Sequence, residues 1–513
     1  MEKDKKETDS SKAALGAKLT ITAKITLPDG SEVTRVIEAE DGIPSPDQID
    51  VSTTRENFLK SFEVLEKSVL EARNRTGEAI IDMMADEIKK KEAGKEITRI
   101  VESELGVVEF PLSKGIVSKL KPKEHIQSAS LMGLMVRLAK EVSYRRATVI
   151  ANEFLHRKGE QAMSHTTSKE RTVSLGLRIS EGWEEEARTV LKSYGVDAGT
   201  GIIGSEADIP MKARHPVLPK SAGEQRAADF ISEYNKKATE ERYKIKSSDG
   251  LAGTESSPEG CCYISVDDVG VKRQKSTRGT KGKKEGKFLE NTVIHIQAGT
   301  LEYTITAIGM DKAFRILIAF LLANGLMEDR RLVFFSDGAT NIRNHISEFF
   351  AFREHTLIID WAHLGKKVRD LSYMAIKGRW KESKKAREDK KNITGQLLHM
   401  IWAGNTEDAI TFLQELDGKN IKSRHWVDEM VRYLEKKRAH IACYAFRKSL
   451  NLRISSNRVE KENDIVVAKR QKHNGMSWSK DGSGALATLT ATMKNGKLAN
   501  WLYGKRDLLK IAS

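Results

Sequence analysis

The chain has 513 residues, too many for one hydrophobic core, so two to four domains are expected. Lysine and arginine outnumber aspartate and glutamate by 87 to 72, and the net charge of +15 favours a polyanionic partner, most simply nucleic acid. Three cysteines, a polar N-terminus and no apolar run of membrane-spanning length argue against a disulfide framework, a Cys-rich zinc site and a membrane protein, and predict a soluble protein of the cytoplasm.

Two small units are expected at the beginning of the chain. Residues 1–50 hold a polar tail and an alternating stretch around a Pro-Asp-Gly turn, which predicts a β-hairpin. Residues 51–125 are predicted to be helical, because Thr53 and Glu56 have the spacing of a capping box and apolar residues follow at helical intervals.

Residues 126–200 contain three short helical patterns, the last opening near Ser164 after a turn at Gly159. This order is typical of a helix-turn-helix DNA-binding unit, with Lys169 and Arg171 on the recognition helix. Any small helical bundle gives the same pattern, so both interpretations remain open at this point.

A helical connector and a linker rich in serine and glycine are predicted over 201–258. The segment 259–365 then opens with an apolar run that ends in Asp267 and Asp268. Two alternating runs joined by a Gly-Thr turn follow as a hairpin, and then helix, strand, helix and strand. This order predicts a mixed sheet with helices on its faces.

An all-helical insertion is predicted over 366–450, and 451–513 returns to the sheet domain with a helix at 457–473 and a C-terminal segment. The expected fold class is therefore multidomain α/β, mostly helical overall, with the sheet domain interrupted by the insertion.

Acidic residues end the predicted strands. Asp337 and Asp360 each follow an apolar run, and parallel strands present their carboxyl ends at one rim. Of the first pair, alternation sends Asp267 and Asp268 to opposite faces, and Asp267, which shares its face with less apolar side chains, is the better ligand. Converging carboxylates suit Mg²⁺ or Mn²⁺, and two such ions can clamp a phosphodiester. The alternatives are a simple turn at Asp337 and a helix cap at Asp360.

Four segments together resemble the DDE transposases of bacterial insertion sequences, in particular their Mutator-like group. The segments are "YISVDDVGVK", "FFSDGATNI", "IIDWAHL" and "SSNRVEKENDIVVAKRQKHNGMSWS". The resemblance covers about 261–513 and implies an RNase H-like catalytic domain with an all-helical insertion. It implies Asp267, Asp337 and Glu460 as catalytic and metal-binding residues, with Asp360 and His363 as possible accessory residues.

The resemblance further implies binding of double-stranded DNA, both terminal inverted repeats and target, by a homodimer or higher oligomer at the bacterial nucleoid. Mg²⁺-dependent strand cleavage and strand transfer would be the activity. A catalytically inactive or domesticated DNA-binding protein of the same fold and a nuclease without strand transfer are the alternatives. For Glu460 the alternative is structural, because Asn457 and Glu460 have the spacing of a capping box; a cap at Ser455 or Ser456 would instead leave Glu460 free to face the rim.

Two basic runs flank the candidate acids. Residues 271–287 contain eight basic side chains and one acidic, and 366–391 contain eleven and four. Such runs are often only solvated faces, but beside the acids they favour contact with DNA phosphates. Including the helix at 457–473 and the helix-turn-helix, the predicted DNA-binding residues are Lys272, Arg273, Lys281, Lys283, Lys284, Lys366, Lys367, Lys469, Arg470, Lys472, Lys169 and Arg171.

Overall fold

The computed structural model forms two compact units, one of residues 1–135 and 145–165 and the other of 136–144 and 166–513. The residues that it describes are 20–26, 32–38, 97–103, 106–112, 126–127, 129–154, 163–216, 223–246, 260–274, 286–378, 382–472, 476–504 and 507–511.

The first unit contains two small sheets. Strands β1 (Thr20–Thr26) and β2 (Glu32–Glu38) form the antiparallel hairpin that the alternation predicted. Strands β3 (Ile97–Ser103) and β4 (Gly106–Leu112) pair antiparallel, and β5 (Ile126–Gln127) joins them. The prediction of a helical region over 51–125 is therefore wrong for 97–103 and 106–112, where valine and isoleucine favour strands. The predicted capping box lies outside the described residues.

Three helices follow, as predicted, but the third is much longer than the pattern suggested. They are α3 (Ala129–Glu141), α4 (Tyr144–Phe154) and α5 (His165–Ser193), and the turn at Gly159 lies outside the described residues. The 29 residues of α5 carry a buried stripe that includes Leu175, Ile179 and Trp183. Most of α5 is thus a packed helix of the second unit rather than a short recognition helix.

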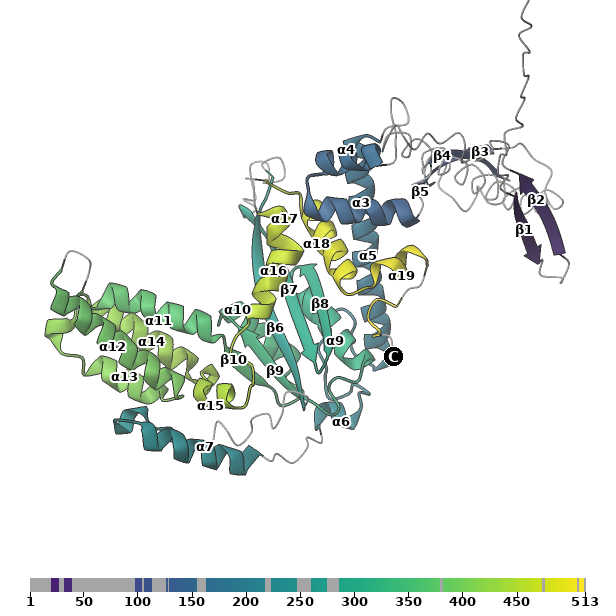
Figure 1. Ribbon diagram of the computed structural model, residues 1–513. Coiled ribbons are helices and arrows are strands. Elements are labelled where there is room, and N and C mark those ends of the chain that lie inside the picture. The colour runs from purple at the N-terminus through teal and green to yellow at the C-terminus, as the bar shows by residue number, and fades with distance from the viewer. Residues whose placement is uncertain are drawn as a thin grey trace, which may run out of the picture. The chain divides into compact units, whose positions relative to one another are not determined.

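The second unit is built on a five-stranded mixed sheet of order β10-β9-β6-β7-β8 (Figure 1). Its strands are β6 (Cys261–Lys272), β7 (Phe288–Ala298), β8 (Leu301–Ile308), β9 (Arg331–Ser336) and β10 (Thr356–Ile359). The first three pair antiparallel, and β6, β9 and β10 run parallel. This confirms the predicted mixed sheet, including the turn at Gly299, whose φ is +60°.

The two faces of the sheet are covered by different helices. Helix α9 (Met310–Ala323) packs on one face, where Phe320 stacks on Tyr303 of β8 at 4.3 Å between ring centres. Helix α10 (Thr340–Phe349) links β9 to β10. The opposite face is covered by α16 (Asn457–Asn463), which contacts β6 and β7, and α18 (Lys480–Lys494), which contacts β8.

The regular elements of the predicted insertion are helices, and an isolated β-bridge joins Ile376 to Ile421. Its helices are α11 (Trp361–Ala375), α12 (Lys384–Trp402), α13 (Thr406–Gln414), α14 (Arg424–Lys437) and α15 (Tyr444–Ser449). Their apolar sides join one hydrophobic core with β9 and β10, which includes Phe335, Leu397 and Leu434. The insertion therefore shares the core of the sheet rather than forming a core of its own.

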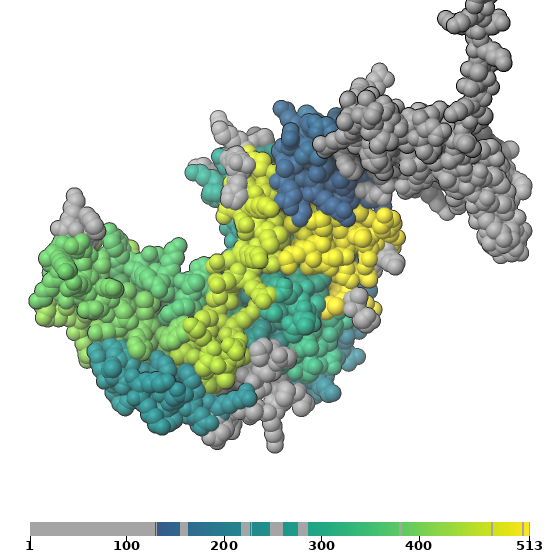
Figure 2. Space-filling model, in the orientation of Figure 1, coloured from purple at the N-terminus to yellow at the C-terminus, as the bar shows by residue number. Residues whose placement is uncertain are grey.

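The last predicted helix returns over the sheet. Helix α16 continues through a π-helical segment (Asp464–Ala468) into α17 (Lys469–Gln471), and Figure 2 shows this yellow-green run at the surface. Beyond it, the backbone of Trp478 bonds to both Lys272 and Gln274 at the end of β6, and Ser479 caps α18. Trp478 thus pairs with the far end of β6 through its backbone.

Several shorter helices complete the second unit. They are α6 (Met211–Arg214), α7 (Gly223–Lys237), α19 (Leu498–Leu502) and three single 3₁₀ turns at Glu241–Tyr243, Gly418–Asn420 and Arg438–His440. Within the described residues, no helix is both long and apolar enough to span a membrane.

The close approach of α5 and α18 generates a prediction. A Cβ atom on Gly176 would lie 2.5 Å from the backbone carbonyl oxygen of Ala485. Gly176→Ala should therefore lower the free energy of unfolding by about 1–3 kcal/mol, because the backbone cannot move aside as a side chain could. Gly395→Ala on α12, where nothing lies within 4 Å of the added atom, should instead raise it by about 0.5–1 kcal/mol. Urea unfolding of both variants measures the difference, and equal effects would contradict this packing.

Candidate active site

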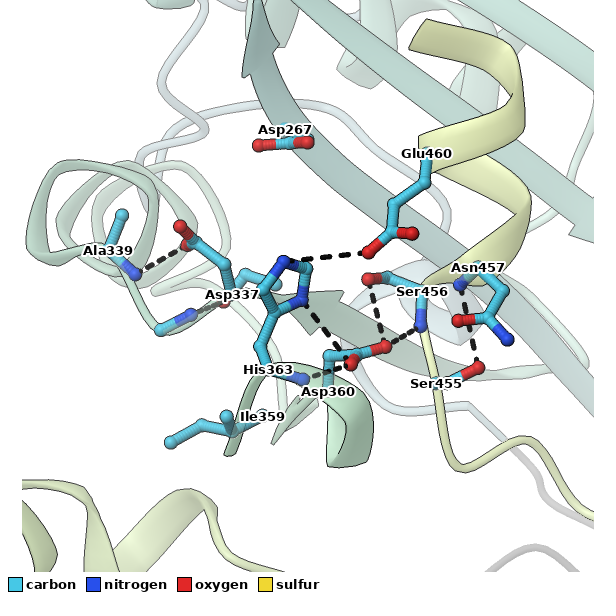
Figure 3. Close-up of polar contacts among 12 residues, drawn as sticks. Asp267, Asp337, Ala339, Ile359, Asp360, His363, Ser455, Ser456, Asn457 and Glu460 are labelled. Carbon is cyan, nitrogen blue, oxygen red and sulfur yellow. Dashed lines mark hydrogen bonds and ion pairs between the residues drawn. The ribbon is translucent and has the colours of Figure 1, made fainter. Parts of the chain in front are cut away.

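Four acidic residues surround the carboxyl ends of the parallel strands (Figure 3). Asp337 and Asp360 directly follow β9 and β10. Strand β9 pairs with β6 only as far as Ser265, so Asp267 lies inside β6 but beyond the end of its parallel neighbour. Glu460 comes from the first turns of α16, nearly two hundred residues after Asp267. The structure thus brings together the four acids that the sequence singled out.

Asp267 and Asp268 point to opposite faces of the sheet, as strand alternation predicted, and Asp267 faces α16. Its neighbour Asp268 points to the opposite face, where its carboxylate accepts hydrogen bonds from Thr292 at 2.7 Å and from Asn341 of α10 at 3.4 Å. Burial raises the pKa of Asp267 to about 6, and the negative charge of Asp337 adds to this effect. The two aspartates of the doublet therefore belong to different environments.

Asp337 is exposed and sits in a tight turn. Its Oδ1 accepts a hydrogen bond from the backbone N–H of Ala339 at 2.7 Å, and Gly338 has a φ of +88°. The buried ammonium of Lys437, at the end of α14, donates to the carbonyl oxygen of Gly338. The turn predicted from Asp337-Gly338 is therefore present, and it holds the carboxylate at the rim.

Asp360 is fully buried and is the cap of α11, as its alternative interpretation predicted. Its Oδ1 accepts from the backbone N–H of His363 at 2.8 Å, and its Oδ2 accepts from the backbone N–H and the hydroxyl of Ser456, the latter at 3.0 Å. Burial by itself would raise the pKa of Asp360, but the hydrogen bonds from His363 and Ser456 hold it below its usual value. Asp360 is thus a structural carboxylate.

His363 joins two of the acids. Its Nδ1 lies 3.3 Å from Oδ1 of Asp360, and its Nε2 lies 3.5 Å from Oε1 of Glu460 (Figure 3). The contact with Asp360 raises the pKa of His363, and the charges of Asp360, Glu460 and Asp337 add to it. A positively charged imidazole is therefore favoured between these carboxylates.

Glu460 is not part of a capping box. Helix α16 begins at Asn457, and Ser456 is its cap residue, so Asn457 lies inside the helix. The Glu460 side chain is 46% exposed and reaches toward His363 instead of the N-terminus of its own helix. The capping-box alternative for Glu460 is therefore wrong, because the chain enters the helix one residue earlier than that spacing requires.

The chemistry of these side chains fits a hard divalent cation, since Asp267, Asp337 and Glu460 offer only carboxylate oxygens. Their spacing in this structure is wider than a single coordination sphere. Among the described residues, no group of three or more histidine, cysteine, aspartate or glutamate side chains is close enough to hold one ion.

The predicted DNA-binding residues differ in their exposure to solvent. Lys272, Lys366, Lys367, Lys472 and Lys169 are exposed, and Arg273 and Arg171 are half-buried. Lys281, Lys283 and Lys284 lie outside the described residues. For all of these, contact with DNA stays a prediction.

Arg470 corrects one of these predictions. It is 5% exposed, donates to the carbonyl oxygen of Ala139 at 2.9 Å and stacks on Trp478 at 5.0 Å. Such a guanidinium stabilises the fold and is not available to a DNA backbone. Lys469 is exposed and already pairs with Glu141 at 2.8 Å.

Three contacts at the site were missed by the sequence analysis. Ser456 bonds to Asp360, Lys437 bonds to the loop of Asp337, and Asn463 donates to Asp267 at 2.6 Å. Only Asn463 carries a local signal, because it follows Glu460 by three residues and so lies on the same side of the helix.

Comparison with known proteins adds little. No family model matches the chain, and no curated protein matches it in sequence. Among solved structures, the chain is similar to a Drosophila P element transposase in a strand transfer complex, with 11% sequence identity and a TM-score of 0.24. The alignment covers 77% of this chain and 86% of that chain. A similarity of this size defines neither fold nor function, so the functional argument depends on the site.

The environment of Asp267 predicts a pH-dependent gain in stability. The pKa of Asp267 is about 6 in the folded protein, against an ordinary value of 3.8. The charged form is therefore disfavoured in the folded state, and the free energy of unfolding falls as the pH rises between these two values. Asp267→Asn should therefore raise the melting temperature of metal-free protein above about pH 6 and lose this advantage below about pH 4. Thermal melts between pH 3.5 and 8 measure it, with the exposed Asp370→Asn as control for the loss of one charge. An advantage that does not change with pH would contradict this environment.

The two strand-ending aspartates should differ in stability. Asp360→Ala leaves the donors of His363 and Ser456 without their buried acceptor and should cost about 2–5 kcal/mol of unfolding free energy. Asp337→Ala removes an exposed carboxylate and should change it by less than about 1 kcal/mol. Denaturant unfolding of both variants makes the comparison. Equal losses would show that Asp360 is not the buried anchor of this site.

Proposed function

We propose that this protein is a DDE-type DNA transposase that uses Asp267, Asp337 and Glu460 to cleave and join DNA strands with Mg²⁺ or Mn²⁺. The sheet domain would be RNase H-like, with the α11–α15 helices as its insertion. The partner would be double-stranded DNA, namely the ends of the mobile element and its target. The protein would act as a homodimer or higher oligomer at the bacterial nucleoid.

One observation carries this proposal: Glu460 returns to the rim that holds Asp267 and Asp337. The insertion separates Glu460 from the strands, yet Oε1 of Glu460 lies 3.5 Å from His363, in the segment that follows β10. A solvated helix face would give no reason for this convergence. Acids from separate parts of a basic chain suit phosphodiester chemistry, because cations can bridge them to a phosphate.

Each residue has a defined part in the proposed reaction. Asp267, Asp337 and Glu460 would hold the ions, which requires them to approach more closely than in the structure described here. When bound, the ions would activate a water and then a DNA 3′-hydroxyl for in-line attack on a phosphodiester. His363 would keep Glu460 directed toward the rim, and Asp360 would fix the position of His363.

The exposed lysines near the rim would bind phosphate groups. Lys366 and Lys367 on α11 and Lys272 at the end of β6 are exposed on elements that adjoin the acids. Contacts of this kind position DNA without reading its sequence, so they would serve both element ends and target.

Mg²⁺-dependent cleavage of DNA that carries the sequences flanking the gene tests the proposal. Asp267→Asn, Asp337→Asn and Glu460→Gln should each reduce cleavage by about a thousandfold or more, and a double variant should lose little more, because ligands of one ion pair act together. Asp268→Asn is the matched control, since it removes the adjacent charge on the opposite face of the sheet and should cleave nearly as the wild type.

The outcomes separate the proposal from its alternatives. Normal cleavage by all three variants would contradict the catalytic assignment, and absence of cleavage by the wild type with retained DNA binding would favour a non-cutting DNA-binding protein. Cleavage without joining of strands would favour a nuclease. Loss of cleavage in the aspartate variants alone would remove Glu460 from the site.

A further inference from the structure

Asn463 forms a direct connection between the elements that carry the first and last candidate acids. It is the final residue of α16 and is 7% exposed. Its Nδ2 donates a hydrogen bond of 2.6 Å to Oδ2 of Asp267 in β6, across 196 residues of sequence. Because Glu460 precedes it by three residues, both side chains leave the same side of the helix.

The carboxylate of Asp267 is held from two directions. Its Oδ1 accepts from the backbone N–H of Asp268 at 2.9 Å, and its Oδ2 accepts from Asn463. One donor thus belongs to β6 itself and the other to α16. Rotation of the carboxylate would break one of these bonds, so the pair fixes the plane in which the oxygen lone pairs point.

Asn463 also marks a change in the helix. The π-helical segment Asp464–Ala468 begins at the next residue. π-helical turns are rare, and they are frequent beside functional sites, because the wider turn realigns the side chains that follow. Burying an amide costs free energy unless it is hydrogen-bonded, and ordinary packing does not require one here. The Nδ2 of Asn463 is bonded to Asp267, whereas its buried Oδ1 has no hydrogen-bond partner among the described residues.

We propose that Asn463 is a positioning residue: it donates to Asp267, orients that carboxylate toward a divalent cation, and ties β6 to α16 so that Asp267 and Glu460 act together. This inference rests on the proposed function. Asn463 acts here as a hydrogen-bond donor, and its amide oxygen is not a ligand of the ion.

Mn²⁺ binding to the full-length protein, followed by the electron paramagnetic resonance of free Mn²⁺, tests the inference. Asn463→Ala should weaken binding by about 10-fold or more, as is usual when a hydrogen-bond partner of a ligand is lost. The metal concentration for half-maximal DNA cleavage should rise by the same factor, while DNA affinity stays unchanged. A purely structural residue would lower stability without shifting this midpoint.

Asn495→Ala is the matched control. The side chain of Asn495 accepts a hydrogen bond from the N–H of Thr304 at 2.9 Å and donates one to its C=O at 2.8 Å, and within the described residues no contact joins it to the candidate acids. Its loss should leave the Mn²⁺ midpoint where it is in the wild type. A shift in this control equal to that of Asn463→Ala would overturn the inference, because general loosening would then explain both.

The variant Asn463→Asp tests whether residue 463 acts as a hydrogen-bond donor to Asp267 or as a ligand of the ion. It keeps the size of the side chain but sets a second carboxylate against Asp267, so cleavage should fall by about 10-fold or more. Full cleavage by this variant would overturn the inference and make residue 463 a ligand. An unchanged Mn²⁺ midpoint in Asn463→Ala would also overturn it.

Mn²⁺ binding to Asp337→Asn is measured in parallel. If this variant too leaves Mn²⁺ binding unchanged, the metal site of the proposed function fails, and not Asn463 alone.

Discussion

The buried carboxylate of Asp360 connects the two halves of the site. It accepts hydrogen bonds from His363 at the start of α11 and from Ser456 at the start of α16, so the chain that leaves the sheet and the chain that returns to it meet on one side chain. Together with the backbone hydrogen bond from Trp361 to Ile454, this contact fixes where α16 begins. The direction of Glu460 and Asn463, both on α16, depends on that starting point.

The four acidic residues differ in burial, and this difference separates a structural carboxylate from those that could bind an ion. Asp360 is enclosed and accepts three hydrogen bonds, and hydrogen bonds from His363 and Ser456 hold its pKa low. Asp267 is half-buried with a raised pKa, and Asp337 and Glu460 are open to solvent. An enclosed carboxylate that already accepts three hydrogen bonds can organise a site but has little capacity left for an ion. The carboxylates at the rim remain able to bind an ion, but in the metal-free protein their negative charges repel one another.

The sequence predicted what depends on short-range periodicity, and missed what depends on distant contacts. The strands before Asp337 and Asp360 follow from short apolar runs, and the opposite facing of Asp267 and Asp268 follows from alternation; the structure has both. The burial of Arg470 could not be predicted, because its partners Ala139 and Trp478 lie outside its own helix. The cap of α16 is Ser456 and not Asn457, and the sequence could not choose between them, because Asp360, the partner of Ser456, lies far away in the chain. The strands at 97–112 were missed because short apolar runs suit helix and strand alike.

Iron-directed cleavage of the polypeptide tests most directly whether one cation joins these distant segments. Fe²⁺ in place of Mg²⁺, with ascorbate and peroxide, cuts the backbone next to the ion. The account predicts three cuts, in β6 near Asp267, in the turn after Asp337 and in the first turns of α16 near Glu460, all suppressed together by excess Mg²⁺. Cuts confined to a single segment, or cuts that Mg²⁺ does not suppress, would contradict a shared metal site.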